Sequence, residues 1–435
     1  MSAKMHLMQM FMFNASTHTL NAWMDANDGQ VGGLTSFAYW KDMARTLERG
    51  CFDGVFFADV SVVHDVYAGN ANTCIEYGVS WPSQDPMPLV AVMADTTEHL
   101  GFGVTLSTSA TPPYLAVRRL STLDNLSGGR VGWNIVTGVS PAEYRANGLA
   151  HMPHDERYDY ADEYMEVCYK LWQAVPSEAI LIDKETGRFA DPSKITTVIH
   201  NGKYLRCHAA PPTFPSAQGR PVLFQAGSSG RGMQFAVKHA EVVFSIQPHQ
   251  PAMQRFMEQI TQTAEREGCP QPKVLFGVQP IIGGTEEEAR RKAQQMLERI
   301  PVEAILARLS GIFGEDLSVF DPDRPIEDIK TQASRGLVAA MSALEDGKPA
   351  TLREVASRWA LSVGIPQITG TPEQVADHLE MLWHKTGCYG FNISPTAAPA
   401  CVTDFVDTVV PLLQKRGLFR TEYSGRTFRE NLMAS

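Results

Sequence analysis

Eight short apolar segments, separated mostly by helical patterns, constrain the fold of this chain more than any other feature. They occupy residues 5–13, 54–59, 101–108, 130–137, 221–227, 242–246, 274–282 and 390–395. Segments this apolar are typical of strands that are buried on both faces, as in parallel sheets. Eight such strands alternating with helices predict an α/β fold of the (β/α)8 TIM-barrel type.

Five of the intervening stretches have the period of amphipathic helices. In the first, Trp40, Met43 and Leu47 share one apolar face, and Gly50 follows the last turn. The five stretches are residues 36–50, 116–129, 155–175, 230–240 and 371–387. Helices at these places would cover the outside of a barrel.

Two connections are too long for one helix and predict insertions in a single domain that spans residues 1–435. The insertion at about 176–220 contains a hairpin pattern with Asn201-Gly202 as its turn. The insertion at about 283–370 is rich in Glu, Arg and Ala, which predicts a helical bundle or a lid.

Composition excludes several classes of partner. The net charge of -10 argues against nucleic acid and against an anionic membrane surface. No apolar run approaches the roughly 18 residues of a membrane span, and the first 13 residues are more typical of a strand than of a signal peptide.

The seven cysteines form no CxxC pair, which is typical of reduced thiols in a cytoplasmic protein.

In a barrel of this type the site lies at the C-terminal ends of the strands. The candidates there are Asn14, Ser16, His18, Asp59, His64, Thr105, Ser107, Asn134 and Thr137. Asn134 lies inside an apolar strand, where an amide without a partner costs roughly 1–3 kcal/mol, so protein or a cofactor should pair with it. Asp59 equally fits a helix cap, and His18 and His64 fit solvated loop positions.

The segment "AGSSGRG" at 226–232 is a strand end, a small-residue turn and a helix start. The backbone amides of Gly227 and the hydroxyls of Ser228 and Ser229 would suit a phosphate, although an ordinary turn with a serine cap explains the pattern equally well. The sequence has neither a Walker A motif nor a GxGxxG motif with its downstream acid, which argues against a nicotinamide cofactor in a Rossmann domain.

The segment "HDERY" at 154–158 opens a helix and places His154 and Tyr158 on one face. Together they could hold an anion at the helix start, or Asp155 could cap the helix while Tyr158 packs in the core. His151 and His154 are three residues apart, but no His-x-His follows the first strand, so we expect no catalytic metal.

Three long motifs, in this order, resemble the bacterial-luciferase-like flavin monooxygenases. They are "LSGGRVGWNIVTG", "HDERYDYADEYMEVCYKLW" and "PVLFQAGSSGRGMQFAVKHAE". The resemblance is strongest to the branch with nitrilotriacetate, dibenzothiophene-sulfone and long-chain alkane monooxygenases. "FDGVFFADV" and "VVPLLQKRGLFRTEY" fit the same branch, so the resemblance covers nearly the whole chain.

The resemblance implies a two-component enzyme of xenobiotic degradation that uses FMN as FMNH2, supplied by a separate NAD(P)H:flavin reductase, with O2 as co-substrate. A flavin C4a-(hydro)peroxide would transfer one oxygen atom to a small-molecule substrate. The resemblance also implies a homodimer or homotetramer. Alternatives are a deazaflavin-dependent dehydrogenase of the same superfamily and a flavin-binding protein without activity.

The resemblance also assigns roles to residues. Asn134 would hydrogen-bond the isoalloxazine edge, and Asp59, Thr105 and Ser107 would line the flavin. The phosphate would be held by His154, Tyr158, Gly227, Ser228 and Ser229. His18 or His64 would tune the protonation of the peroxide, because histidine ordinarily titrates near neutral pH.

This chain departs from the pattern of its relatives at three places. Leu20-Asn21 stands where relatives have His-Gly, "LSGIFGEDLS" lacks the histidine of the sulfone type near residue 312, and Gly138 replaces a frequent serine. Fewer polar groups in the pocket favour an apolar or aromatic substrate, including sulfur-containing or halogenated compounds. Few basic residues lie near the predicted mouth, which argues against a polycarboxylate.

Overall fold

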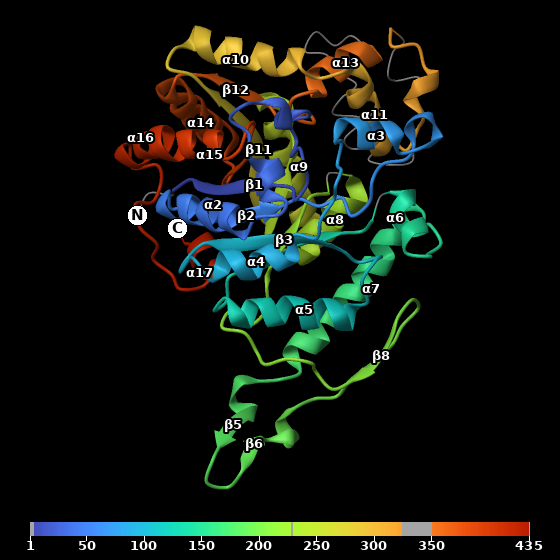
Figure 1. The fold of residues 1–435 in the computed structure, drawn as a ribbon. Coiled ribbons are helices and arrows are strands. Elements are labelled where there is room, and N and C mark those ends of the chain that lie inside the picture. Colours follow the sequence, from blue (N-terminus) through green and yellow to red (C-terminus); the bar gives the residue numbers. More distant parts are fainter. Residues whose placement is uncertain (1–3, 139, 228, 324–349, 435) are drawn as a thin grey trace.

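The computed structural model describes residues 4–138, 140–227, 229–323 and 350–434, and its centre is a closed barrel of parallel strands (Figure 1). Neighbouring strands pair in parallel in the order β10-β9-β4-β3-β2-β1-β13-β11, and β10 also pairs with β11, which closes the barrel. The strands are β1 (His6–Phe11), β2 (Gly54–Phe57), β3 (Gly101–Ser107), β4 (Val131–Val136), β9 (Val222–Gln225), β10 (Val242–Ser245), β11 (Lys273–Ile282) and β13 (Gly390–Ile393). Each lies within one of the eight predicted segments or overlaps it almost completely, so the predicted TIM barrel is confirmed.

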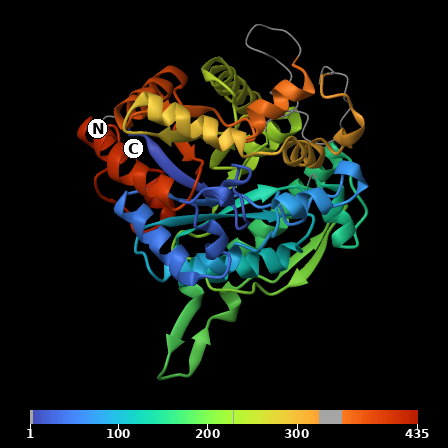
Figure 2. The same ribbon diagram turned by 45° about the horizontal axis from the view of Figure 1, so that its top comes forward.

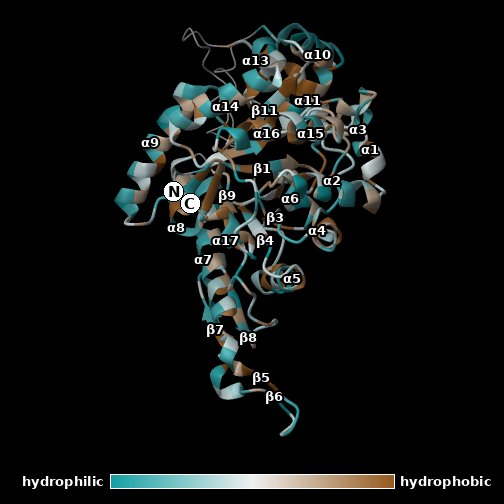
Figure 3. Ribbon diagram, turned by 90° about the vertical axis from the view of Figure 1, so that its left-hand side faces the viewer, coloured by the Kyte–Doolittle hydropathy of each residue, from teal (hydrophilic) through white to brown (hydrophobic). Residues whose placement is uncertain are grey.

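Amphipathic helices cover the outside of the barrel. Trp40, Met43 and Leu47 of α2 are buried against the strands, and Ser36 caps this helix by accepting a hydrogen bond from the Tyr39 amide. The hydropathy colouring shows the same separation, with hydrophobic residues on the strands and hydrophilic residues on the outer faces of the helices (Figure 3). The covering helices include α2 (Phe37–Arg49), α4 (Met87–Ala94), α5 (Pro113–Leu126), α7 (His154–Gln173), α8 (Gly230–His239), α9 (Gln250–Glu267), α14 (Pro372–Thr386) and α16 (Val410–Lys415).

The inside of the barrel is a packed apolar core that the C-terminal segment closes from one end. Met8, Met10, Phe56 and Phe224 fill it, and Phe428 of α17 (Phe428–Leu432) packs against them at the N-terminal ends of the strands. A Cβ atom at Gly101 would lie 2.1 Å from the Phe428 ring, so glycine is needed there. The inside of the barrel can therefore be reached only from the opposite end, where the strands have their C-terminal ends.

The segment from about 176 to 220 forms an arm that extends away from the barrel (Figures 1 and 2). Its strands β7 (Val198–Asn201) and β8 (Arg206–Ala209) pair antiparallel, as the hairpin pattern predicts. The predicted two-residue turn at Asn201-Gly202 is wrong, because residues 202–205 form the loop and the Gly202 amide donates to the Leu205 carbonyl over 2.9 Å. A second hairpin, β5 (Ile180–Asp183) with β6 (Arg188–Ala190), was not predicted.

The described part of the segment from about 283 to 370 is mainly helical. It contains α10 (Glu286–Glu298), α11 (Val302–Phe313) and α13 (Leu352–Trp359), followed by β12 (Gln367–Gly370), an unpredicted strand that pairs with the end of β11. Ala304 and Phe313 share an apolar cluster with Leu20 and Cys74, which belong to the chain that follows β1 and β2. These helices therefore cover the C-terminal ends of β1 and β2.

No helix among the described residues is both long and apolar enough to cross a membrane. The same residues contain no group of three or more His, Cys, Asp or Glu side chains with the arrangement of a metal site. All seven cysteines are free thiols.

Candidate active site

Asn134 and Thr105 lie side by side on the inner face of the barrel, because β3 and β4 pair in register at these residues. The Asn134 Nδ2 donates to the Thr105 Oγ1 over 2.8 Å, and this hydroxyl donates to the Phe57 carbonyl over 2.8 Å. The Asn134 Oδ1 is buried and has no hydrogen-bond partner within the described ranges. The buried amide thus presents one unpaired acceptor, which favours a ligand N–H or a water in front of it.

Further unpaired polar atoms gather where other barrel strands end. Within the part of the chain that the structure describes, buried side-chain atoms of Ser16, His18, Thr108, Gln279 and Ser394 also lack hydrogen-bond partners. Gln279 lies on β11, Thr108 and Ser394 directly follow β3 and β13, and Ser16 and His18 lie in the loop after β1. Buried polar groups in protein cores are normally paired, so this concentration indicates a binding site for a polar molecule with its water.

The starts of α7 and α8 meet beside this opening. The Ser229 Oγ accepts a hydrogen bond from the Gly232 amide over 3.1 Å, and it lies 3.3 Å from the His154 Nε2. Tyr158 is buried one turn further along α7 from His154, with its ring against Phe235. Ser229 is therefore a helix cap, and Tyr158 is a packing residue. Together with His154 they nevertheless surround the N-terminus of α8, and a helix N-terminus favours an anion.

Two glycines make room at this helix start. A Cβ atom would lie 3.0 Å from the Tyr158 Oη if built on Gly227, and 2.8 Å from it if built on Gly232. The Gly227 amide donates to the Gln225 Oε1 over 2.6 Å. A phosphate fits this arrangement of small residues, hydroxyls and imidazole. Ser228, the fifth residue predicted to hold the phosphate, lies outside the described residues.

Asp59 follows β2, and two further acidic side chains approach it, Asp85 from the loop before α4 and Glu143 from α6 (Pro141–Ala146) after β4. Burial raises the pKa of Asp59 to about 7, and the nearby carboxylates of Asp85 and Glu143 add to the rise. The Ser107 and Ser109 hydroxyls are 2.7 Å apart, and Ser109 donates to Glu143 over 3.4 Å. No helix starts directly after Asp59, so the alternative that it caps a helix is wrong.

We expect Asp59 to make the stability of the protein pH-dependent. Its folded-state pKa lies above the ordinary carboxyl value, so the folded state binds more protons than the unfolded state between about pH 4 and pH 7. The free energy of unfolding should fall across this range, and Asp59→Asn should be more stable than the wild type at pH 8 by roughly 1–3 kcal/mol. Urea unfolding at pH 5 and pH 8 measures this. Asp42→Asn on the exposed face of α2 is the control, and equal pH dependence in Asp59→Asn and wild type would contradict the expectation.

His18 and His64 lie under α11 at the ends of β1 and β2. Burial and the nearby Arg308 guanidinium lower the pKa of His18 to about 3, and the same two causes lower the pKa of His64 to about 4. A Cβ atom at Gly311 would lie 2.2 Å from the His64 ring, so α11 packs directly on that imidazole. Both histidines are therefore neutral near pH 7, and the expectation that they titrate there is not supported.

The pH profile of activity should reflect these values. Between pH 5.5 and pH 8.5 we expect neither imidazole to contribute an inflection, so His18→Gln and His64→Gln should keep the wild-type profile shape. An inflection near pH 7 should instead disappear in Asp59→Asn. Profiles of kcat/KM for the three variants test this. If the inflection of kcat/KM near pH 7 disappears in either histidine variant, that imidazole titrates during the reaction.

Three residues near the site were missing from the sequence prediction. Arg308 donates to the His18 carbonyl over 2.7 Å and to the Thr17 carbonyl over 3.1 Å, and Arg157 donates to the Gly138 carbonyl over 2.9 Å. Gln225, the third, is the last residue of β9, so its place at a strand end could have revealed it. Arg157 lies within the "HDERY" segment, so the interest of that segment could have revealed it too, whereas the sequence around Arg308 on α11 carries no such signal.

Comparison with known proteins agrees with this geometry. The family model described as luciferase-like monooxygenase matches residues 13–390. Dibenzothiophene-sulfone monooxygenase of Rhodococcus erythropolis (strain XP) is 39% identical over 440 residues, which covers 99% of this chain and 96% of the relative. Nitrilotriacetate monooxygenase component A of Aminobacter aminovorans is 33% identical over 434 residues, covering 97% and 95%.

The fold also matches a solved structure along its whole length. A crystal structure of riboflavin lyase with modified FMN and riboflavin superposes with a TM-score of 0.92 at 33% identity. The match covers 99% of this chain and 96% of the lyase. The barrel, the unpaired acceptor of Asn134 and the family match lead to one conclusion: this chain belongs to the luciferase-like monooxygenase family and is a flavin-dependent monooxygenase.

Proposed function

We propose that the protein is the oxygenase of a two-component system, which uses FMNH2 and O2 to insert one oxygen atom into a small apolar or aromatic compound. Sulfur-containing and halogenated compounds are included in this class. The observation that carries the proposal is the buried Asn134 Oδ1 at the barrel mouth. No donor among the described residues forms a hydrogen bond with this oxygen. The names of relatives support it, because one acts on an aromatic sulfone and a solved relative holds modified FMN.

The residues at the mouth fit FMN. Asn134 would accept a hydrogen bond from the isoalloxazine edge, while Asp59, Thr105 and Ser107 would line the ring. The phosphate would be held by His154, Tyr158, Gly227 and Ser229, and by Ser228 on the sequence resemblance alone. When bound, reduced FMN supplies the electrons that activate O2, so that one oxygen atom enters the substrate and the other leaves as water.

The chain's own contribution is to position the reactants and to exclude water. Ile312 of α11 and Val63 pack against the apolar cluster that includes Leu20, which gives the cover of the mouth an apolar character. This cluster supports an apolar or aromatic substrate. Arg157 and Arg308 each donate to a backbone carbonyl, and the Arg157 Nε is buried without a hydrogen-bond partner among the described residues. His18 and His64 would act as neutral hydrogen-bonding groups near the reacting oxygen.

The proposal extends to partners and organisation. A separate NAD(P)H:flavin reductase would supply FMNH2, which agrees with the name "component A" of the nitrilotriacetate relative. We further propose a homodimer or homotetramer of single-domain chains, each with insertions at about 176–220 and 283–370. Seven free thiols favour the cytoplasm.

Turnover with a generic flavin reductase, FMN and NADH tests the function. A panel of aryl sulfones, thioethers, haloarenes and alkanes is offered, and oxygenated product and hydrogen peroxide are both quantified. We expect at least one apolar compound to give product while peroxide release falls by the same amount. Peroxide alone with every compound, equal to the yield of the reductase without this protein, would contradict the proposal.

A further inference from the structure

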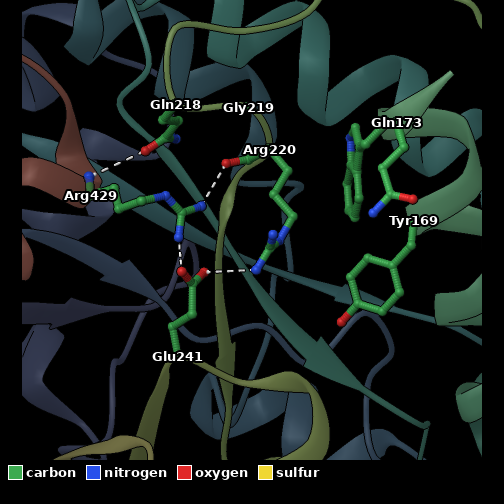
Figure 4. A pocket seen from close by; sticks show the side chains of 8 residues that line it. Tyr169, Gln173, Gln218, Gly219, Arg220, Glu241 and Arg429 are labelled. Atoms are coloured by element: carbon green, nitrogen blue, oxygen red, sulfur yellow. Dashed lines mark hydrogen bonds and ion pairs between the residues drawn. The ribbon is translucent and has the colours of Figure 1, made fainter. Parts of the chain in front are cut away.

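A second cavity lies at the other end of the barrel from the mouth, where α7 passes the starts of β9 and β10 (Figure 4). Its volume is about 390 Å³, which is within the usual size of small-molecule sites. The walls include Tyr169 and Trp172 from α7, Arg220 and Glu241 from the residues just before β9 and β10, and Arg429 from α17. Nothing in the proposed oxygenase function uses these side chains.

The cavity holds two guanidinium groups and one carboxylate. Glu241 is ion-paired with Arg429 through one oxygen, and its other oxygen accepts the Leu223 amide over 3.0 Å. Arg429 also donates to the Arg220 carbonyl over 2.9 Å, so it is fixed as part of the wall. The two guanidinium groups share this single carboxylate, so the side chains that line the cavity carry one positive charge in excess. Burial, together with the like charge of Arg220, lowers the pKa of Arg429 to about 10.

Arg220 is the less tightly held of the two cations. Its ion pair with Glu241 is long, with 3.8 Å between the Arg220 Nη2 and the Glu241 Oε2 (Figure 4). The Arg220 Nε is buried and finds no partner among the residues the structure describes. Its guanidinium carbon lies 5.7 Å from the centre of the Tyr169 ring. A guanidinium group with an unpaired N–H binds carboxylates, sulfonates and phosphates well.

Hydrogen bonds hold both aromatic side chains of the wall in place. The Tyr169 ring already contacts the Arg220 guanidinium and stacks on the His239 ring, so Trp172 offers the aromatic surface of the cavity. The Tyr169 hydroxyl lies 3.0 Å from the His239 Nδ1, and the Trp172 Nε1 donates to the Ser121 Oγ over 3.0 Å. The two ring centres are 6.2 Å apart. Rings fixed in this way lose little conformational freedom when a flat ligand stacks on them.

We propose that this cavity binds a small aromatic anion, an aryl carboxylate or sulfonate, with its charged group on Arg220 and its ring against Trp172. The site is separate from the flavin site, so it can be occupied while the enzyme turns over. The excess positive charge favours a ligand with a negative charge, and the fixed aromatic rings favour a planar ligand.

Fluorine NMR of 4-fluorobenzenesulfonate with the full-length protein tests the site. We expect binding by the wild type, and no binding of neutral 4-fluorobenzamide at the same concentration. Arg220→Gln should raise the Kd of the sulfonate at least ~10-fold, whereas Arg220→Lys should keep most of the affinity. Arg45→Gln, an exposed arginine on α2, is the control and should bind as the wild type does.

A second variant separates the ring contact from the charge. Trp172→Leu should weaken 4-fluorobenzenesulfonate but leave the weak binding of inorganic sulfate unchanged. Sulfonate affinity that Arg220→Gln does not alter would place the probe elsewhere, for example at the barrel mouth, and would overturn the proposal. Failure of the wild type to bind the sulfonate would also overturn it. Neither result would affect the oxygenase proposal, which turnover measures.

Discussion

Replacing Gly232 with alanine should weaken FMN binding about 100-fold while the protein stays folded. The added Cβ atom would lie 2.8 Å from the Tyr158 Oη and 2.9 Å from the Ser229 Oγ, so at least one of these groups must move. Both are proposed to hold the flavin phosphate. Hydrogen bonds to a charged group contribute ~1.5–3 kcal/mol each, and ~2.7 kcal/mol corresponds to a 100-fold change in Kd. Fluorescence titration with FMN measures it.

Gly230 provides the matched control in the same helix turn. A Cβ atom built there meets no atom within 4 Å, so Gly230→Ala should bind FMN as the wild type does. Alanine is also the better helix former by ~1 kcal/mol, so weaker binding in Gly232→Ala cannot come from loss of α8. Equal affinities of the two variants would show that the phosphate lies elsewhere.

Replacing Asp53 with alanine should lower the free energy of unfolding by ~3–5 kcal/mol. The Asp53 carboxylate is fully buried at the N-terminal end of the barrel, where it accepts the Leu7 amide over 2.8 Å and pairs with His6 and Arg420. Arg420 in turn donates to the Asn431 carbonyl over 3.0 Å, so the carboxylate ties the C-terminal segment to β1 and β2. Without it a buried guanidinium remains uncompensated.

The pH dependence of this contribution has a defined sign. Burial raises the pKa of Asp53, but Arg420 and His6 lower it by more than burial raises it. The pKa in the folded protein is therefore below the ordinary value. The stabilisation is complete above the ordinary carboxyl pKa of about 4 and is lost as the pH falls through the folded-state value. Urea unfolding at pH 7 measures the full effect. Asp407→Ala breaks an exposed pair with Arg49 and should cost less than ~1 kcal/mol. A cost this small for Asp53→Ala would contradict the role of the carboxylate.

The barrel could be predicted because both of its periodicities are visible in the sequence. Runs such as "GVFFAD" are too apolar for a strand with one solvent face, and the stripe from Trp40 to Leu47 fixes the face of α2. Strand β12 was missed because Gln367 and Thr369 make it polar and its single partner is the end of β11. The turn after β7 was misplaced because the Asn201-Gly202 pattern favours a two-residue turn, whereas the backbone of residues 202–205 closes a longer one.

The site was only partly accessible from sequence. Asn134 was identified because an amide in an apolar strand needs a partner, and the structure places its oxygen without one among the described residues. The neutrality of His18 and His64 was not foreseen. It results first from burial and then from the charge of Arg308, which lies 290 residues after His18 and approaches both imidazoles only because α11 folds over the mouth. Local patterns do not encode such long-range contacts.

The most direct test of the central claim is an anaerobic titration of the protein with photoreduced FMN, followed by rapid mixing with oxygenated buffer. The account predicts saturable binding of one FMNH2 per chain and reoxidation at least ~10-fold slower than that of free FMNH2, because a flavin held inside the barrel mouth is shielded from water. Asn134→Leu should weaken the binding. If the wild type does not bind FMNH2, or if the flavin reoxidises as fast as it does in free solution, the assignment of the barrel mouth as a reduced-flavin site is wrong.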